Sequence, residues 1–409
     1  MSNDKQPEIR FPGFAEDWKQ RKLIEGVSKI GDGLHGTPSY SEDGDVFFIN
    51  GNNLVNGKIS ITKETKFVNE SDQSKDDKSL NVNTILMSIN GTIGNLAWYN
   101  NEKVMLGKSI AYLTVSDFDK NFVYFYLQTP MMRKYFISNL TGTTIKNLGL
   151  KTIRNTELFV ADLDEQQKIG SFFKQLDDTI ALHQRKLDLL KETKKGFLQK
   201  MFPKNGAKVP EIRFPGFTED WEERKLNEGM TEYTDRVYIQ DDEIYKQVSV
   251  KNVGEITLRG EQIGSKIGRK RQAKVNLIEH PDTLIFTRQT IEQGGIGFAP
   301  KETDGAIVTE NMPTIDVDND IINCNYLLAY VKTEDWYRKV ILKNIEGGTA
   351  QIAIHEDSIL SSEVLIPKIE EQQKIGAFFK QLDDTITLHQ RKLDLLKETK
   401  KGFLQKMFV

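Results

Sequence analysis

Cysteine and long apolar runs are scarce in this chain. Cys324 is the only cysteine among 409 residues, so the chain can form neither an internal disulfide nor a cysteine-based zinc cluster. No run approaches the ~18 consecutive apolar residues that a membrane span needs, and the first ten residues lack the apolar core of a secretory signal. We therefore expect a cytoplasmic protein that has no membrane partner.

Signatures of catalysis are also missing. Gly31, Gly33 and Gly36 spell G-x-G-x-x-G, but Pro38 follows where a helix should begin. Gly107-Lys108-Ser109 imitates the end of a phosphate-binding loop, yet Glu102 stands where that loop requires a glycine. Only five histidines remain for acid–base work or metal binding. We expect no catalytic residue, no metal site and no cofactor of the chain's own.

The overall composition is that of a globular protein with no strong charge. Hydrophobic residues make up 38% and charged residues 28%, and the formal net charge is −3. This balance gives no general attraction to nucleic acid, although a local basic face is enough for phosphate contact. Such a cluster is present at Lys266, Arg269, Lys270, Arg271 and Lys274.

The chain contains a long internal repeat. Residues 182–202 recur unchanged at 388–408, and the octapeptide Pro7–Phe14 recurs at Pro210–Phe217. The segments between them differ almost throughout. A period of this length is far longer than a solenoid repeat, so each copy is a domain plus a connector. We predict domains at 1–160 and 206–366, with repeat segments 7–26 and 210–229, and connector helices at 161–205 and 367–409.

Each connector shows the pattern of a coiled-coil helix. Apolar residues alternate at spacings of four and three over more than four heptads, and charged residues fill the other faces. A helix over 165–202 would reach ~57 Å. The first seam is Ile169, Phe173, Leu176, Ile180, His183, Leu187, Leu190, Lys194, Phe197 and Met201. The second is Ile375, Phe379, Leu382, Ile386, His389, Leu393, Leu396, Lys400, Phe403 and Met407.

Chain order predicts that the two helices pair antiparallel, because the first leads into the second domain and the second ends the chain. A symmetric pairing would place His183 against His389, which we interpret as a register device rather than a metal pair. Lys194 would fall opposite Phe379 and reach solvent with its ammonium group. Disulfide trapping of His183→Cys with His389→Cys tests this register.

The two variable domains share an α/β plan. We predict strands at 45–50, 84–89 and 104–115 in the first, and at 243–250, 283–288 and 306–317 in the second. One helix is expected in each, at 122–140 and 325–345, followed by a Gly-Thr turn. The fold class is therefore α/β (α+β), with two similar domains joined by two long antiparallel coiled-coil helices in a pseudo-two-fold repeat.

Polar loops of the two domains carry most of the sequence differences. Loops on a fixed scaffold are where recognition residues lie, and amide, hydroxyl and basic side chains suit base edges and phosphates. We predict DNA contacts from His35, Thr37, Ser39, Tyr40, Asn50, Asn52, Asn53, Ser88, Asn90, Thr92, Lys108, Thr143, Lys146, Asn147, Lys246, Ser249, Lys251, Arg269, Lys270, Arg271, Arg288, Gln289, Thr290, Thr349 and Gln351. Among these, Arg288 and Gln289 are expected to read bases, and Arg269, Lys270 and Arg271 to contact phosphate.

The chain resembles the DNA sequence-specificity subunits of type I restriction-modification systems. The resemblance covers the whole chain and rests on the duplicated architecture, on E-Q-Q-K-I-G at Glu165 and Glu371, and on D-G-x-H-x-T-P at Asp32–Pro38. The second domain lacks this last stretch, so His35, Thr37 and Ser39 have no counterparts there.

The resemblance implies a non-catalytic subunit in which each domain reads one half of a split site on double-stranded DNA. Two modification subunits, which bind S-adenosylmethionine and methylate adenine, and two motor-nuclease restriction subunits are the implied partners. The half-sites would lie in opposite orientation, ~34 Å apart.

Two other functions remain open. A coiled-coil scaffold presenting two protein-binding domains would suit the acidic balance, and weak salt dependence of ligand binding would indicate it. An enzyme with a split active site is the second of these. A duplicated enzyme would be expected to repeat its active-site motif, whereas in this chain the segments between the repeated sequences differ.

Overall fold

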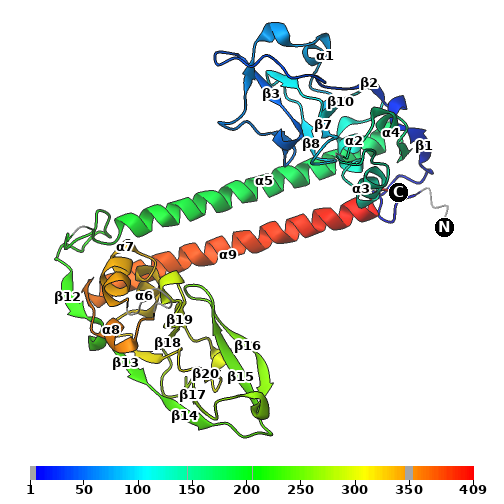
Figure 1. Ribbon diagram of the computed structural model, residues 1–409. Helices are drawn as coiled ribbons and strands as arrows, with labels where there is room; N and C mark the ends of the chain where they lie inside the picture. The colour runs from blue at the N-terminus through cyan, green and yellow to red at the C-terminus, as the bar shows by residue number, and fades with distance from the viewer. Residues whose placement is uncertain (1–5, 145, 205, 346–352) are drawn as a thin grey trace. The chain divides into compact units, whose positions relative to one another are not determined.

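The computed structural model describes residues 6–144, 146–204, 206–345 and 353–409. The chain forms two compact units, one of residues 1–184 with 391–409 and the other of residues 185–390. Two helices, α5 (Leu163–Lys200) and α9 (Ile369–Lys406), each run from one unit into the other (Figure 1). Each unit therefore contains one variable domain, the first half of one helix and the second half of the other.

The first variable domain is built on a four-stranded antiparallel sheet ordered β2-β10-β7-β8. A second sheet, β6-β3-β9, contains one parallel pair, β3 with β9. The strands are β2 (Val27–Asp32), β10 (Ile110–Val115), β7 (Thr84–Ser88), β8 (Leu96–Trp98), β6 (Phe67–Val68), β3 (Val46–Ile49) and β9 (Val104–Leu106). Two-stranded pairs are β1 (Lys19–Lys22) with β11 (Glu157–Val160) and β4 (Leu54–Val55) with β5 (Lys58–Ile59). The short helices α1 (Lys75–Lys78) and α4 (Leu150–Arg154) complete the domain.

The second domain repeats this plan with a larger second sheet. Its antiparallel sheet is ordered β13-β21-β18-β19, and its other sheet, β14-β17-β20-β15-β16, again contains one parallel pair, β15 with β20. The strands are β13 (Met230–Tyr233), β21 (Thr314–Val317), β18 (Thr283–Phe286), β19 (Ile296–Phe298), β14 (Asp235–Tyr238), β17 (Arg271–Lys274), β20 (Ile307–Val308), β15 (Ile244–Val250) and β16 (Ile256–Ile263). β12 (Glu222–Lys225) pairs with β22 (Glu363–Ile366), and α8 (Glu356–Leu360) precedes β22.

The helix predicted within each domain is broken, so the single-helix prediction was wrong. Residues 122–140 contribute to α2 (Lys120–Tyr126) and α3 (Pro130–Ser138), because a proline disfavours helical backbone at the residue before it. Thr129 instead caps α3 through Met132 N–H. In the second domain α6 (Cys324–Tyr330) is followed by α7 (Glu334–Trp336), capped by Thr333, and by a π-helical turn at Tyr337–Ile341.

Two of the predicted strands are likewise pairs of strands. The run 104–115 divides into β9 and β10 at a turn around Gly107, and 306–317 divides into β20 and β21. In each case the two strands belong to different sheets. A short turn therefore carries the chain from the parallel pair to the antiparallel sheet in both domains.

The predicted connector helices and their antiparallel pairing are confirmed. Both helices lie within the predicted connectors 161–205 and 367–409, and α5 begins and ends two residues before the predicted helix 165–202. Every predicted seam residue is buried or half-buried, whereas Leu182 and Leu189, off the seam, are 56% and 67% exposed. In the first unit Lys400 of α9 pairs with Asp177 of α5 at 2.6 Å. In the second unit Lys194 of α5 pairs with Asp383 of α9, so its ammonium binds a carboxylate one turn beyond the predicted Phe379. The contact between His183 and His389 stays a prediction.

The end of each helix closes the core of a domain. Phe408, just after α9, lies among Trp18, Phe122, Tyr126 and Phe173, with ring centroids 5.1–6.5 Å away. Phe202, just after α5, has the equivalent neighbours Trp221, Tyr326, Tyr330 and Phe379 in the second unit. In the first unit the red end of α9 lies beside α2 and α3 (Figure 1), and Tyr126 donates a hydrogen bond to the Val409 carbonyl at 2.7 Å.

The repeated E-Q-Q-K-I-G motif docks the start of each helix onto its own domain. Glu165 is fully buried and accepts two hydrogen bonds from Arg10. Gln166 accepts a hydrogen bond from the Asp119 backbone N–H, at the start of α2, at 2.9 Å. A Cβ on Gly170 would lie 2.5 Å from Asp119 Oδ1, so only glycine permits this approach.

The second copy of the motif makes the same contacts. Glu371 binds Arg213, Gln372 accepts from the Asn323 N–H at 2.9 Å, and a Cβ on Gly376 would lie 2.6 Å from Asn323 Oδ1. Arg10 and Arg213 both belong to the repeated octapeptide. The repeated sequences therefore make the same contacts in both units, where they fix the start of each helix to its domain.

Candidate nucleic-acid interface

Loops from five parts of the first domain meet at one end of its sheets. Leu34 bridges to Gly107, and Asn90 bridges to Asn147. The Ile89 N–H donates to the Ser109 carbonyl at 2.9 Å, and the Gly51 N–H donates to Ser109 Oγ at 2.8 Å. We call this assembly the first rim. It consists of residues 33–36, 50–53, 88–94, 107–109 and 141–147, without residue 145.

Several of the predicted contact residues serve to hold the first rim together. Asn53 Oδ1 accepts from the Asn50 N–H at 2.9 Å, and its amide nitrogen donates to the Ser60 carbonyl. Asn50 Oδ1 in turn accepts from Ser109 Oγ at 3.0 Å. Ser88 is fully buried and donates to the Thr92 carbonyl. These groups fix the loop shapes, which leaves the neighbouring exposed side chains to make contacts.

The exposed predicted residues of this end of the domain are polar or basic. His35 is exposed and lies 2.8 Å from Asp32, and Tyr40 is 47% exposed with the Lys66 ammonium 4.2 Å from its ring centre. Asn90 and Asn147 are half-buried, and the buried side-chain oxygen Oδ1 of Asn90 has no hydrogen-bond partner among the described residues. The remaining exposed members are Thr37, Ser39, Asn52, Thr92, Lys108, Thr143 and Lys146.

The second domain has an equivalent rim. The Arg288 N–H donates to the Asn311 carbonyl at 2.9 Å, as Ile89 does to Ser109 in the first. The Ile354 N–H donates to the Arg288 carbonyl at 3.0 Å, as Leu148 does to Ile89. We call residues 251–254, 287–295 and 309–312 the second rim. Gln289 and Lys251 are exposed on it and Thr290 is half-buried. Lys246 is exposed and Ser249 half-buried on β15, whereas Thr349 and Gln351 lie outside the described residues.

Acidic side chains neutralise most of the basic cluster of the second domain. Arg269 pairs with Glu310 of the second rim, and Lys274 lies 3.4 Å from Asp235. Lys270 pairs with Asp241 and also donates to the Gly264 carbonyl at 2.8 Å. Of the three residues predicted to contact phosphate, Arg271 alone forms no ion pair with any described residue, and it is exposed on β17.

Arg288 is held by an acidic partner that the sequence did not indicate. Its guanidinium makes two hydrogen bonds to Glu356, the first residue of α8, one of them at 2.7 Å. Both side chains are largely buried, at 21% and 12% exposure. Burial alone would raise the pKa of Glu356, but the bond from Arg288 leaves that pKa lowered. The equivalent positions in the first domain are Ile89 and Leu150, two apolar residues packed in its core.

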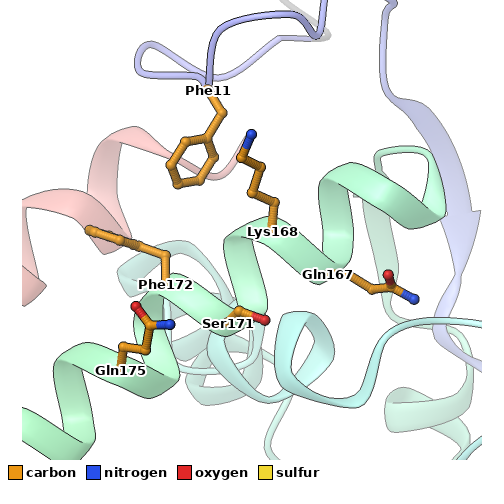
Figure 2. Close-up of a pocket in the computed structure, with 6 residues that line it drawn as sticks. All are labelled: Phe11, Gln167, Lys168, Ser171, Phe172 and Gln175. Carbon is orange, nitrogen blue, oxygen red and sulfur yellow. The ribbon is translucent and has the colours of Figure 1, made fainter.

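A second exposed feature lies on the repeated segments. Phe11, Phe172 and Lys168 border a shallow pocket of about 430 Å³ at the start of α5 (Figure 2). The Lys168 ammonium lies 5.5 Å from the Phe11 ring centre, and the Phe11 and Phe172 rings meet edge to face. The second unit has the same pair in Phe214 and Phe378, with centroids 6.1 Å apart.

Two kinds of site are not found in the part of the chain that the structure describes. No group of three or more His, Cys, Asp or Glu side chains is placed to hold a metal ion there. None of the described helices is long and apolar enough to cross a membrane.

Comparison with known proteins identifies the family. The sequence profile described as "Type I restriction modification DNA specificity domain" matches residues 15–192 and again residues 207–398. The MjaVIII specificity subunit of a type I restriction enzyme from Methanocaldococcus jannaschii is 22% identical over 69% of this chain and 68% of its own. The MjaX specificity subunit of the same organism is 23% identical over 95% of this chain and 92% of its own.

A solved structure supports the fold. The S subunit of a type I restriction-modification system from M. genitalium matches 99% of both chains with a TM-score of 0.63 and 14% sequence identity. At this identity the likeness concerns the fold alone. The double profile match spans most of the sequence, and the chain belongs to the family of type I restriction-modification DNA specificity subunits.

Proposed function

We propose that this chain reads a split sequence on double-stranded DNA, one half-site through each of the domains 1–160 and 206–366. The observation that carries the proposal is that the two rims share their backbone structure and differ in their exposed side chains. Equivalent backbone hydrogen bonds build the two rims, while the exposed residues on them differ. A fixed scaffold with exchangeable loop residues suits two different base sequences.

The chain itself would take no part in catalysis. It would direct two modification subunits, which supply S-adenosylmethionine and methylate adenine, and two restriction subunits, which cleave. Family membership supports this role.

The pocket at Phe11 and Phe172 and the equivalent segment at Phe214 and Phe378 are the proposed docking surfaces for the modification subunits. We define the first docking surface as Phe11, Lys168, Phe172 and Leu182, and the second as Phe214, Lys374, Phe378 and Leu388. Leu182 and Leu388 are 56% and 65% exposed. Exposed apolar side chains favour a protein partner. Because both surfaces come from repeated sequence, they suit two copies of one partner.

Modified-base sequencing tests the proposal. A methylation-free host would express this chain together with its modification subunit, and a parallel host would express the modification subunit alone. The expected result is a new split motif with methylated adenine in each half, seen only when this chain is present. Replacing residues 230–366 with another such domain should change one half of the motif. If the proteins co-purify and no motif appears, recognition by this chain is contradicted.

A further inference from the structure

Opposite charges stand at equivalent positions of the two rims. Lys108 lies in the turn between β9 and β10, and Glu310 in the segment between β20 and β21. Each directly precedes the residue whose carbonyl accepts the rim hydrogen bond, Ser109 in the first domain and Asn311 in the second. Both Lys108 and Glu310 are exposed.

Strand register agrees with this equivalence. In the first domain Thr84 pairs with Thr114 and Ser88 pairs with Ile110. In the second, Thr283 pairs with Asp316 and Ile285 with Thr314. Continuing both ladders outward brings Lys108 opposite Asn90 and Glu310 opposite Gln289. In both rims a carboxamide residue therefore lies opposite an exposed charged residue of reversed sign, but Gln289 is exposed whereas Asn90 is half-buried with its Oδ1 buried.

The two charges suit different bases. In the major groove a lysine donates to the O6 and N7 acceptors of guanine, whereas a carboxylate accepts from the N4 amino group of cytosine. A carboxamide matches adenine at its N6 and N7 atoms. The reversed charge would therefore give the two domains contrasting preferences, while the exposed Gln289 would add an adenine preference in the second domain.

We infer that Lys108 and Glu310 are equivalent specificity-determining positions, Lys108 selecting a guanine in the first half-site and Glu310 a cytosine in the second. This inference rests on the proposed DNA recognition. In the absence of DNA, Lys108 forms no ion pair with any described residue, whereas Glu310 is held by Arg269. DNA binding in the second domain would release Glu310 and leave Arg269 available for a phosphate.

The test uses the full chain with its modification subunit and reads the methylated motif of Lys108→Ala, Lys108→Glu and Glu310→Ala. Lys108→Ala should lower discrimination at one base pair of the first half-site by about 5- to 150-fold, the range of a good base contact. Lys108→Glu should change the preferred base there. Glu310→Ala should relax one pair of the second half-site, and each variant should leave the other half unchanged.

Matched controls separate base reading from general charge effects. Lys103 and Glu302 are exposed, and each precedes the strand that leads to its rim. Lys103→Ala and Glu302→Ala should preserve the whole motif. If the wild-type chain gives a split motif and Lys108→Ala leaves it unchanged, this inference is overturned while the proposed function stands. If the wild-type chain gives no motif, the proposed function fails first.

Discussion

The carboxylate of Glu165 and the guanidinium of Arg10 form a two-point ion pair, with N–O distances of 2.6 and 2.7 Å. The carboxylate also accepts a hydrogen bond from the Trp18 indole at 3.1 Å. These three groups join the repeated octapeptide, the segment that follows it and the start of α5. The pair is therefore a point at which segments distant in sequence are fixed within the first unit.

Glu165→Gln should destabilise the first unit. The substitution leaves the Arg10 guanidinium buried without its counter-charge, and breaking a buried pair in this way costs about 3–5 kcal/mol. Hydrogen exchange should speed up in β1, β11 and the start of α5, and urea unfolding should move to lower concentration. Glu25→Gln removes an exposed partner of Arg21 and should leave both measurements unchanged. Equal behaviour of the two variants would contradict a stabilising role for the buried pair.

Phe408→Ala should weaken the N-terminal domain although the substitution lies one residue from the end of the sequence. Loss of a fully packed phenylalanine costs about 3–5 kcal/mol, and the cavity would open among Trp18, Phe122 and Phe173. Hydrogen exchange should accelerate in β7 and β10 and stay unchanged in β18 and β21. Phe202→Ala should give the reverse pattern. Leu395→Ala, at a position 63% exposed, is the control.

Cys324 should react slowly with alkylating reagents. Burial, together with the neighbouring Asp282 carboxylate, raises the pKa of the thiol to about 12. At pH 8 only about one molecule in ten thousand would therefore carry the thiolate. Alkylation is slow as a result, because the thiolate is the form that attacks the reagent. Iodoacetamide modification followed by mass spectrometry should show slow labelling in buffer and fast labelling in urea. Labelling in buffer at the rate of a cysteine-containing peptide would contradict this burial.

Leu182→Glu and Leu388→Glu should each remove one modification subunit from the complex. A carboxylate on a proposed docking surface would be costly to bury against an apolar partner. Native mass spectrometry of the co-expressed complex should show one bound copy for either single variant and none for the double variant. Lys186→Glu, an exposed substitution on the same helix, should preserve two copies. Loss of both copies from a single variant would contradict independent surfaces.

The repeat and the heptad seams were sufficient to predict two domains of one plan and two antiparallel helices. The break in the helix of the first domain was also within reach of sequence reasoning, because Thr129-Pro130 is a helix-start signal. The docking function of the E-Q-Q-K-I-G motif could not be predicted from the sequence. Glu165 binds Arg10, which lies 155 positions away, and no local pattern indicates that pairing. The residues of the rims could be listed from loop composition. Which of them are exposed depends on hydrogen bonds such as those of Asn53 that only the folded chain reveals.

Comparison of the two domains changes the role that we assign to Arg288. As an isolated polar residue at a strand end it was expected to read a base. Its equivalent in the first domain is Ile89, which is 2% exposed, and the equivalent of its partner Glu356 is Leu150. An ion pair in one copy thus stands where the other has two apolar residues of the core. This comparison favours a role for Arg288 in holding α8 against the sheet, with Gln289 as the neighbouring reader.

A double substitution separates these two roles. Arg288→Ala should lower stability by about 3–5 kcal/mol, because Glu356 would remain buried without its counter-charge. Arg288→Ile combined with Glu356→Leu introduces the residues found at the equivalent positions of the first domain and should be neutral or stabilising. The pKa of Glu356 lies below its ordinary 4.5 in the folded chain, so its contribution is present above that pH and is lost as the pH falls further. The stability difference between wild type and Arg288→Ala should therefore shrink in acid.

Selection of preferred DNA sequences by the same variants tests whether Arg288 also reads a base. If Arg288 holds α8 in place, the Ile–Leu double variant should recover both the unfolding midpoint and the selected sequence of the second half-site. If Arg288 reads a base, the double variant should be stable and yet lose discrimination at one base pair, as a lost guanine contact does. Gln289→Ala is the comparison that should relax the half-site without altering stability, because its side chain is exposed. A stable double variant with an unchanged half-site therefore assigns Arg288 to the fold and recognition at this loop to Gln289.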